Sequence, residues 1–261
     1  MGRIIAVANQ KGGVGKTTTA VNTAAALAAM KQRVLLVDID PQGNATTGSG
    51  IDKHASENTT LEALMGEVPL ADCLARSEAG YDVLPSNGDL TAAEVQLLDA
   101  PMREKHLEQA LAPVKDSYDY ILIDCPPSLN MLTLNALVAA DGVLVPLQTE
   151  YYALEGLSAL RSTVQQIKEH RNPRLEIEGI LRTMHDPRNN LDNQVSAQLI
   201  QHFGDKVFRT IIPRNVRVAE APSHGLPVML YDRASRGAIS YMALASEMTR
   251  RHIPQPTNTP A

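Results

Sequence analysis

The chain has 261 residues, of which 44% are hydrophobic and 3% aromatic, and its net charge is −5. This length suffices for one large α/β domain, and no run approaches the roughly 18 apolar residues of a membrane-spanning helix. No signal-peptide pattern precedes the first apolar run, so we expect a cytoplasmic protein. With no Trp and two Phe, the chain lacks base-stacking platforms, and any contact with nucleic acid must be mainly ionic.

Charge is divided unevenly along the chain. Residues 1–160 hold 10 Lys and Arg against 20 Asp and Glu, a balance of −10, whereas residues 161–261 hold 14 against 9, a balance of +5. The C-terminal part can therefore carry a basic face although the whole chain is acidic. The two cysteines, Cys73 and Cys125, lie far apart without metal-ligand spacing, so we expect buried, reduced thiols.

Apolar, β-rich runs alternate with helical patterns. The runs are Arg3–Asn9, Arg33–Asp40, Tyr81–Ser86, Asp119–Pro127, Gly142–Gln148, Leu175–Met184 and Val207–Pro213, and an Ala-rich helix is predicted over Thr17–Lys31. Because the runs are continuously apolar, they predict strands buried on both faces, in a doubly wound α/β fold with a mostly parallel sheet and helices on both faces. We expect residues 1–252 to form a single domain and the proline-rich residues 253–261 a disordered tail.

The first predicted strand leads into NQKGGVGKTTT, residues Asn9–Thr19, and then into the Ala-rich helix. A strand, a Gly-rich turn ending in Lys-Thr and a helix form the context of a P-loop NTPase. In such a loop, backbone N–H groups hold phosphate, Lys16 reaches the β- and γ-oxygens, and the Thr17 hydroxyl binds Mg²⁺. The pattern is a variant, because Gln10 replaces the usual first Gly. A second lysine, Lys11, lies at the loop entrance, where it is free to reach another nucleotide; a solvated surface lysine is the alternative.

Carboxylates follow two other predicted strands. Asp38 and Asp40 lie in VDIDPQGNAT, and Asp124 ends the strand of YILIDCPPS. The carboxyl ends of parallel strands face the ligand crevice. Asp40, just beyond its strand, is predicted to position the attacking water, while Asp38 is expected to orient the loop or the magnesium shell, with helix capping as the alternative. Asp124 is predicted to hold Mg²⁺ through a coordinated water.

No arginine occupies an obvious finger position near these motifs. P-loop nucleotidases without one hydrolyse slowly, on the order of 10⁻⁴ to 10⁻² per second. We therefore expect weak ATPase activity that an activating partner stimulates.

The segment KGGVGKTTT resembles the deviant Walker A loop of the ParA/MinD class of P-loop ATPases. The resemblance is to the chromosomal ParA (Soj-type) partitioning ATPases, and it continues through RVLLVDIDPQGNAT, YILIDCPPSL, TIIPRNVRVAEAPSHGLPV and YDRASRGA. It implies that Lys11 crosses a two-fold interface to the other subunit's nucleotide, so that ATP lies between the protomers of a homodimer. It also implies that Pro213 and Asn215 hold the adenine ring. The predicted ATP-binding residues are thus Lys11, Gly12, Gly13, Val14, Gly15, Lys16, Thr17, Thr18, Pro213 and Asn215, and the predicted catalytic residues are Lys11, Lys16 and Asp40.

Several basic residues lie in the positively charged part of the chain, namely Arg188, Lys206, Arg209, Arg214, Arg217, Arg233 and Arg236. The resemblance implies that Arg188 and Arg217 contact the DNA backbone, and Arg214 and Lys206 are further candidates; a solvated charged face is the alternative. Phosphate contacts give affinity without sequence preference. No helix-turn-helix domain fits before Arg3, which favours nonspecific binding of double-stranded DNA, and the family implies nucleoid association and a ParB-like centromere-binding partner.

Three other classes share parts of this pattern. A MinD-like membrane-cycling ATPase binds the bilayer through a C-terminal amphipathic helix, but the tail after EMTRRH is broken by prolines. A carboxylate-activating synthetase or nucleotide kinase would need an acceptor pocket, and none can be singled out. A nitrogenase-type iron–sulfur reductase needs cluster-ligating cysteines, which Cys73 and Cys125 do not match. The sequence favours a DNA-segregation ATPase that does not bind membranes.

Overall fold

The computed structural model describes residues 2–252, so the tail expected at 253–261 lies outside the described residues. One eight-stranded sheet runs through this part of the chain, in the order β3-β4-β2-β5-β1-β6-β7-β8. Its strands are β1 Arg3–Val7, β2 Val34–Asp38, β3 Ala75–Arg76, β4 Asp82–Leu84, β5 Tyr120–Asp124, β6 Gly142–Gln148, β7 Glu176–His185 and β8 Val207–Pro213. Six of the seven predicted runs contain one strand each, and the seventh, Leu175–Met184, covers β7 except for its last residue, His185. The eighth, β3, has two residues and pairs antiparallel with β4, whereas the other described pairings are parallel.

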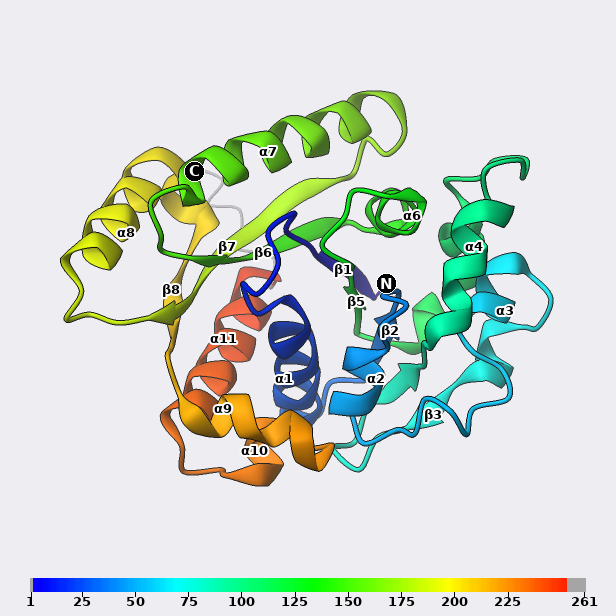
Figure 1. Ribbon diagram of the computed structural model, residues 1–261, viewed down its shortest axis with the longest axis horizontal. Helices are drawn as coiled ribbons and strands as arrows, with labels where there is room; N and C mark the ends of the chain where they lie inside the picture. The colour runs from blue at the N-terminus through cyan, green and yellow to red at the C-terminus, as the bar shows by residue number, and fades with distance from the viewer. Residues whose placement is uncertain (1, 253–261) are drawn as a thin grey trace, which may run out of the picture.

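Helices cover both faces of the sheet (Figure 1). One face carries α1 Lys16–Ala29, α2 Asn44–Gly48, α9 Val216–Glu220, α10 Val228–Tyr231 and α11 Arg236–His252. The other carries α3 Thr60–Met65, α4 Thr91–Gln96, α5 His106–Leu111, α6 Met131–Ala139, α7 Ala153–His170 and α8 Asn190–Phe203. Short 3₁₀ helices lie at Leu70–Cys73, Gly88–Leu90, Lys115–Ser117, Gly204–Lys206 and Ala221–His224. The predicted doubly wound α/β fold is confirmed.

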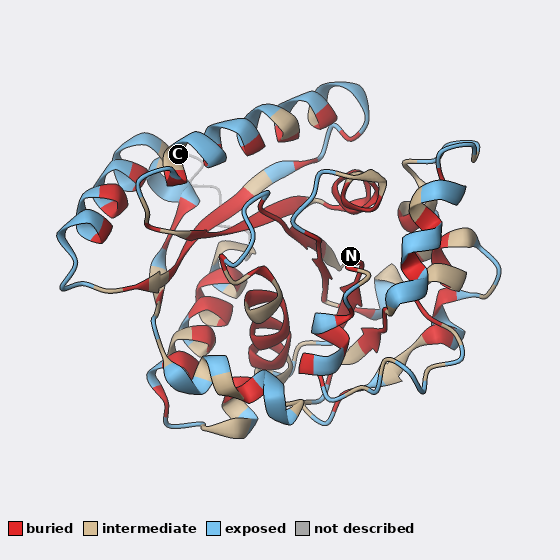
Figure 2. Cartoon of the chain, viewed as in Figure 1, coloured by how far each residue is buried: buried red, intermediate tan, exposed pale blue. Residues whose placement is uncertain are grey.

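The central strands are buried on both faces, as their continuous apolar sequences predicted (Figure 2). Along β1, Ile4 and Ala6 join the apolar cluster under α3 to α8, while Ile5 and Val7 join the cluster under α1 and α11. Helix α1 confirms the predicted Ala-rich helix. Its small side chains let it pack closely on the sheet, and it leads directly from the Gly-rich loop.

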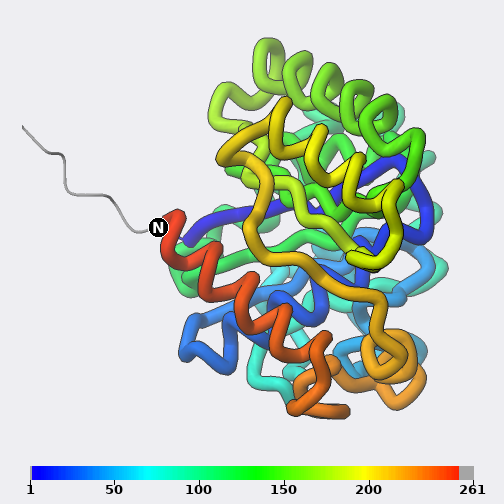
Figure 3. Tube along the Cα trace, turned by 90° about the vertical axis from the view of Figure 1, so that its left-hand side faces the viewer, coloured from blue at the N-terminus to red at the C-terminus, as the bar shows by residue number. Residues whose placement is uncertain are grey.

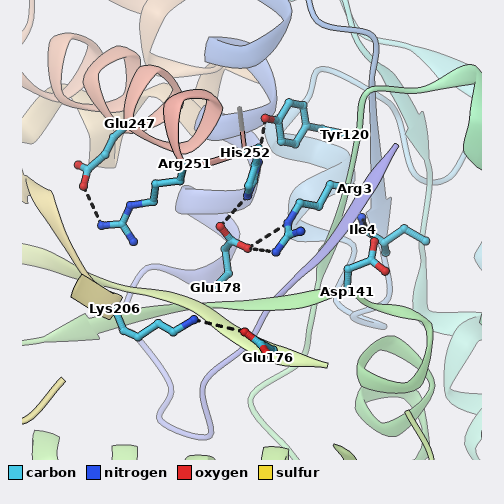
Figure 4. A network of polar contacts seen from close by, with 10 residues as sticks. All are labelled: Arg3, Ile4, Tyr120, Asp141, Glu176, Glu178, Lys206, Glu247, Arg251 and His252. Carbon is cyan, nitrogen blue, oxygen red and sulfur yellow. Dashed lines mark hydrogen bonds and ion pairs between the residues drawn. The ribbon is translucent and has the colours of Figure 1, made fainter. Parts of the chain in front are cut away.

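The last helix, α11, returns to the start of β1 (Figure 3). Glu178 of β7 accepts hydrogen bonds from Arg3 Nε at 3.1 Å and Nη2 at 2.7 Å, and its other oxygen lies 2.7 Å from His252 Nε2. The Tyr120 hydroxyl lies 2.9 Å from His252 Nδ1 (Figure 4). This network fixes the amino edge of the sheet and the end of α11, at the opposite edge from the Gly-rich loop.

Candidate nucleotide-binding site

A cavity of about 760 Å³ lies at the carboxyl edge of the sheet, within the range of small-molecule sites. Parallel α/β sheets bind ligands at this edge. The cavity brings together most of the predicted site: Gly12, Gly13, Gly15, Lys16, Thr17, Thr18, Asp40, Pro213 and Asn215 all line it. Three predicted residues are placed differently. Val14 is buried behind the loop, Asp124 is buried beneath the cavity, and Lys11 lies exposed beside it.

The Gly-rich loop has the backbone conformation of a phosphate cradle. Gly13 and Gly15 have φ angles of 74° and 86°, in the left-handed region that glycine adopts readily. A Cβ atom at Gly12 or Gly13 would meet no atom within 4 Å, so the loop faces open space. Helix α1 begins after Gly15 without a side-chain cap, which leaves its first N–H groups available to a phosphate.

Two side chains that we did not predict hold the loop from behind. The Thr183 hydroxyl, near the end of β7, donates to the Val14 carbonyl at 2.8 Å. Asn9 donates to the Pro146 carbonyl at 2.8 Å and accepts from the Lys11 N–H at 3.0 Å. The second contact is a local Asx turn, which the Asn before the Gly-rich run could have indicated. Thr183 carries no local signal, since the fold alone brings it to the loop.

The two lysines of the loop point in different directions. Lys16 is buried, and its Nζ donates to the Lys11 carbonyl at 3.2 Å, within the loop. Burial lowers the pKa of Lys16, and the nearby Asp124 carboxylate opposes that shift. The Lys11 side chain is 49% exposed, and its Nζ forms an ion pair with Glu150, in the segment between β6 and α7. Lys11 is thus directed out of its own phosphate loop.

Asp124 has the environment of a magnesium-shell carboxylate. Both of its oxygens are buried and accept no hydrogen bond of good geometry from the described residues, although the Thr17 side chain lies close enough to lower its pKa. Burial, with the charge of Asp38 second, raises the pKa of Asp124 well above its usual range. A buried carboxylate without donors suits a hydrated cation. Thr17 and Asp124 therefore fit Mg²⁺.

The two carboxylates after β2 differ in position. Asp40 lines the cavity, and its Oδ1 accepts the Gln42 N–H at 3.0 Å. Asp38 is fully buried, and its oxygens accept from the N–H groups of Asp40 at 3.2 Å and Thr46 at 2.8 Å and from the Thr46 hydroxyl at 2.7 Å. Burial raises the pKa of Asp38 to about 6 despite these donors. Asp38 thus holds the segment from Asp40 to Thr46, and its bond to the Thr46 N–H in the first turn of α2 agrees with the helix-capping alternative. Asp40 faces the ligand space.

The far end of the cavity is formed by the end of β8 and by Met184 of β7. Pro213 and Asn215 lie there beside Ile212 and Tyr241, which makes this end more apolar than the phosphate end. Met184 has a φ angle of 51°, an uncommon conformation for a residue other than Gly. Such conformations gather at binding sites. We did not predict Met184, because nothing in its sequence neighbourhood marks the conformation.

The structure separates the four predicted DNA-contacting residues. Arg214 follows β8 directly and lines the rim of the cavity. Arg217 lies three residues further on, in α9, and pairs with Glu220 at 2.9 Å and Asp232 at 3.4 Å. Arg188 follows the neighbouring strand β7 and pairs with Asp186 at 2.8 Å. These three share the carboxyl edge of the sheet. Lys206 precedes β8, at the opposite edge, 3.5 Å from Glu176 (Figure 4).

Known proteins with similar sequences identify the family. Residues 2–177 match the AAA domain family. An uncharacterized protein of Pseudomonas putida is 61% identical over 252 residues, 96% of each chain. The sporulation initiation inhibitor protein Soj of Bacillus subtilis is 54% identical over 95% of this chain and 98% of its own length, and the chromosome partitioning protein ParA of Myxococcus xanthus is 53% identical over 98% and 90%. The chain belongs to the ParA/Soj family of chromosome-partitioning ATPases.

Solved structures show the same fold. Cobyrinic acid a,c-diamide synthase of Mycobacterium smegmatis, with bound ADP and magnesium, superposes with a TM-score of 0.85, at 39% identity over 96% of this chain and 95% of its own. The cell division ATPase MinD of Pyrococcus furiosus gives 0.80, at 26% identity over 96% of this chain and all of its own. The fold is therefore shared by proteins with different functions, whereas the ParA/Soj relatives are more similar in sequence.

Both cysteines are free and buried, as expected, so the described residues show no disulfide.

Helix α11 packs its apolar residues, among them Tyr241, Leu244 and Met248, against α1 and the sheet. None of the helices between residues 2 and 252 has the length and apolar character needed to cross a bilayer.

Proposed function

We propose that this chain is a chromosome-partitioning ATPase whose ATP-bound homodimer binds DNA nonspecifically and is released when ATP is hydrolysed. The observation that carries the proposal is the arrangement of the two lysines, because Lys16 lies within the phosphate loop while Lys11 extends outward from it. As a member of its family the chain is an ATPase, with ATP as substrate and Mg²⁺ as cofactor. The proposed steps are the dimer, the DNA contact and the partner that stimulates hydrolysis.

Within one subunit the cavity provides the groups that phosphoryl transfer to water requires. The loop N–H groups and Lys16 would bind the β- and γ-phosphates, and Thr17 and Asp124 would hold Mg²⁺, which would supply positive charge for phosphoryl transfer. Asp40 lines the same cavity and orients the attacking water. Pro213 and Asn215 lie at the end where the base would bind.

Exposed side chains on the surface beside the loop favour contact with a second subunit. Lys11 is exposed there, and Leu129, Tyr151 and Tyr152 are 48%, 73% and 70% exposed. Leu129 lies between β5 and α6 and the tyrosines lie between β6 and α7, so these side chains belong to segments that leave the carboxyl edge of the sheet. Burying them in a dimer would be favourable, and a Lys11 that leaves Glu150 would meet the partner's phosphates.

The three arginines at the carboxyl edge form the proposed DNA face. Arg188 and Arg217 are exposed and each pairs with a partly exposed carboxylate of its own chain, and such surface pairs contribute little in water. DNA phosphates can therefore replace those partners. Two such faces held rigidly in one dimer would bind far more tightly than either alone, which makes DNA affinity depend on ATP.

A mobility shift on random duplex DNA tests the proposal. Wild type should shift the DNA with Mg-ATP but not with Mg-ADP, and Lys11→Ala should not shift it with either nucleotide while still binding ATP. Equal DNA binding in ATP and ADP would contradict the proposal. Sedimentation with anionic liposomes in Mg-ATP tests the MinD-like alternative, for which the protein would pellet with lipid.

A further inference from the structure

Behind the cavity wall, four residues form a closed ring of hydrogen bonds around Asp40. The Asp40 N–H donates to Asp38 Oδ1 at 3.2 Å, and Asp38 Oδ2 accepts the Thr46 hydroxyl at 2.7 Å. That hydroxyl accepts the Ser86 N–H at 2.9 Å, and the Ser86 hydroxyl donates to the Asp40 carbonyl at 2.9 Å. The ring thus begins and ends on the backbone of Asp40.

The ring joins two neighbouring elements, β2 and α2, to a segment that is 40 residues beyond Thr46 in the sequence. Asp38 ends β2, Thr46 lies in α2, and Ser86 follows β4, the strand that pairs with β2. Asp38, Thr46 and Ser86 are each 0% exposed, and none of them lines the cavity, which the Asp40 side chain does. In a buried setting each bond is strong, and removing one partner leaves another group unpaired.

The turn after Asp40 is pressed against the same ring. Gly43 has a φ of 63° and donates its N–H to the Asp40 carbonyl at 2.9 Å. A Cβ atom at Gly43 would lie 2.5 Å from the Ser86 carbonyl oxygen, so only glycine fits there without movement. The Asp40 carbonyl is therefore held from two sides, by Gly43 and by the Ser86 hydroxyl.

We propose that Thr46 and Ser86 are positioning residues for ATP hydrolysis, which fix the Asp40 backbone so that its carboxylate meets the attacking water. This inference rests on the role given to Asp40 in the proposed function. Hydrogen bonds hold both the N–H and the carbonyl of Asp40, so its backbone is fixed, and its Oδ1 accepts the Gln42 N–H at 3.0 Å. Small displacements of a catalytic group cost large factors in rate. Neither Thr46 nor Ser86 touches the nucleotide space, so their loss should affect turnover and leave ATP binding nearly unchanged.

The experiment measures single-turnover ATP hydrolysis and the Kd for a fluorescent ATP analogue. Thr46→Val keeps the shape of the side chain and removes its hydroxyl, and we expect hydrolysis at least about tenfold slower with the Kd changed by less than about twofold. Thr46→Ser restores the hydroxyl and should recover most of the rate. Ser86→Ala removes only the bond to the Asp40 carbonyl, and should show the same separation of rate from affinity even if Thr46→Val folds poorly.

Ser49→Ala is the matched control. The Ser49 hydroxyl is buried at the end of α2, donates to the Ala45 carbonyl at 2.7 Å and accepts from Tyr81 at 2.8 Å, outside the ring. It should lower stability without slowing hydrolysis. Wild-type rates in both Thr46→Val and Ser86→Ala, or an equal loss in Ser49→Ala, would overturn the proposal. Asp40→Ala in the same assay distinguishes a failure of this proposal from a failure of the proposed function. If Asp40→Ala hydrolyses ATP normally, the role given to Asp40 itself is wrong.

Discussion

At the scale of single residues, Lys11 and Lys16 of the same short loop lie in different surroundings, as the proposed dimer requires. The two lysines are five residues apart in the sequence. Lys16 is buried near Asp124 and Asp40, whereas Lys11 is exposed and pairs with the partly exposed Glu150. The buried Lys16 Nζ stays within its own loop, where the proposed function has it bind the phosphates of its own subunit. Exposure leaves Lys11 available to a neighbour, at the cost of an ion pair that is weak in water.

Asp40→Ala should abolish hydrolysis while preserving ATP binding, because the residue lines the cavity without holding the loop glycines or Lys16. The variant should consequently remain on DNA in the presence of ATP. Phosphate release and DNA retention measured on the same sample test this expectation. Normal phosphate release would show that another group positions the water.

Asp124→Asn should raise the free energy of unfolding measured without Mg²⁺. The reason is that the carboxylate is buried without donors and its folded pKa is raised well above that of the unfolded chain. Denaturant unfolding without metal measures the gain, and with Mg-ATP the order should reverse, since the variant binds Mg²⁺ weakly. A variant less stable than wild type in both conditions would contradict this account of Asp124.

In the wild type, the raised carboxylate pKa values likewise make the folded state less stable when the carboxylates are charged. Burial raises the folded pKa of Asp38 to about 6, and the folded pKa of Asp124 is also raised. As the pH falls, the folded state therefore binds protons before the unfolded chain does. Without metal, lowering the pH from 7.5 toward 6 should therefore increase stability.

The residues of the site that could be predicted are those carried by local motifs. Lys16, Thr17 and Asp40 lie in or next to patterns whose chemistry is readable from a few adjacent letters. Thr183 and the Thr46–Ser86 pair could not be found that way, because their partners are brought close only by the folded sheet.

At the scale of elements, Glu178 fastens α11 to β1 and β7. Burial alone would raise the pKa of Glu178, but hydrogen bonds and charge from His252 and Arg3 outweigh it and lower the pKa to about 2. A carboxylate whose pKa is lower in the folded state stabilises the protein at pH values above its pKa in the unfolded chain, which is near 4.5 for Glu178. This stabilisation is lost as the pH falls toward the folded pKa of about 2.

Glu178→Gln should therefore lower the free energy of unfolding by about 2 kcal/mol at pH 7, a figure reduced for the partial exposure of Arg3. The difference from wild type should shrink below pH 4.5. Urea unfolding across this range measures it, and a difference that persists unchanged at pH 3 would show that packing, not charge, explains the loss.

The strands were predictable because burial on both faces leaves continuous apolar runs. The two-residue β3 was not, since it is too short for any periodic pattern. Short helices such as α2 and α9 were also missed, because five residues form no full amphipathic repeat.

At the scale of the whole molecule, the basic balance of residues 161–261 does not form one face. The arginines after β7 and β8 share the carboxyl edge, whereas Lys206 lies at the other edge beside Glu176. The net charge of residues 161–261 indicated a basic region. The direction of β7 and β8 shows that its basic residues lie at opposite edges of the sheet.

Arg217→Ala should reduce the salt dependence of DNA binding by about two in the log–log slope, since a dimer loses two phosphate contacts at about 0.9 each. Titrations with DNA at several salt concentrations measure this slope. Lys206→Ala is the matched control and should leave the slope nearly unchanged. The reverse result would place the DNA face at the amino edge.

The central claim is that Lys11 joins two subunits through ATP. Its most direct test is the molar mass, by light scattering, of Asp40→Ala with Mg-ATP, compared with the Asp40→Ala/Lys11→Ala double variant. We expect a dimer for the first and a monomer that still binds ATP for the second. A double variant that remains a dimer in Mg-ATP would contradict the account.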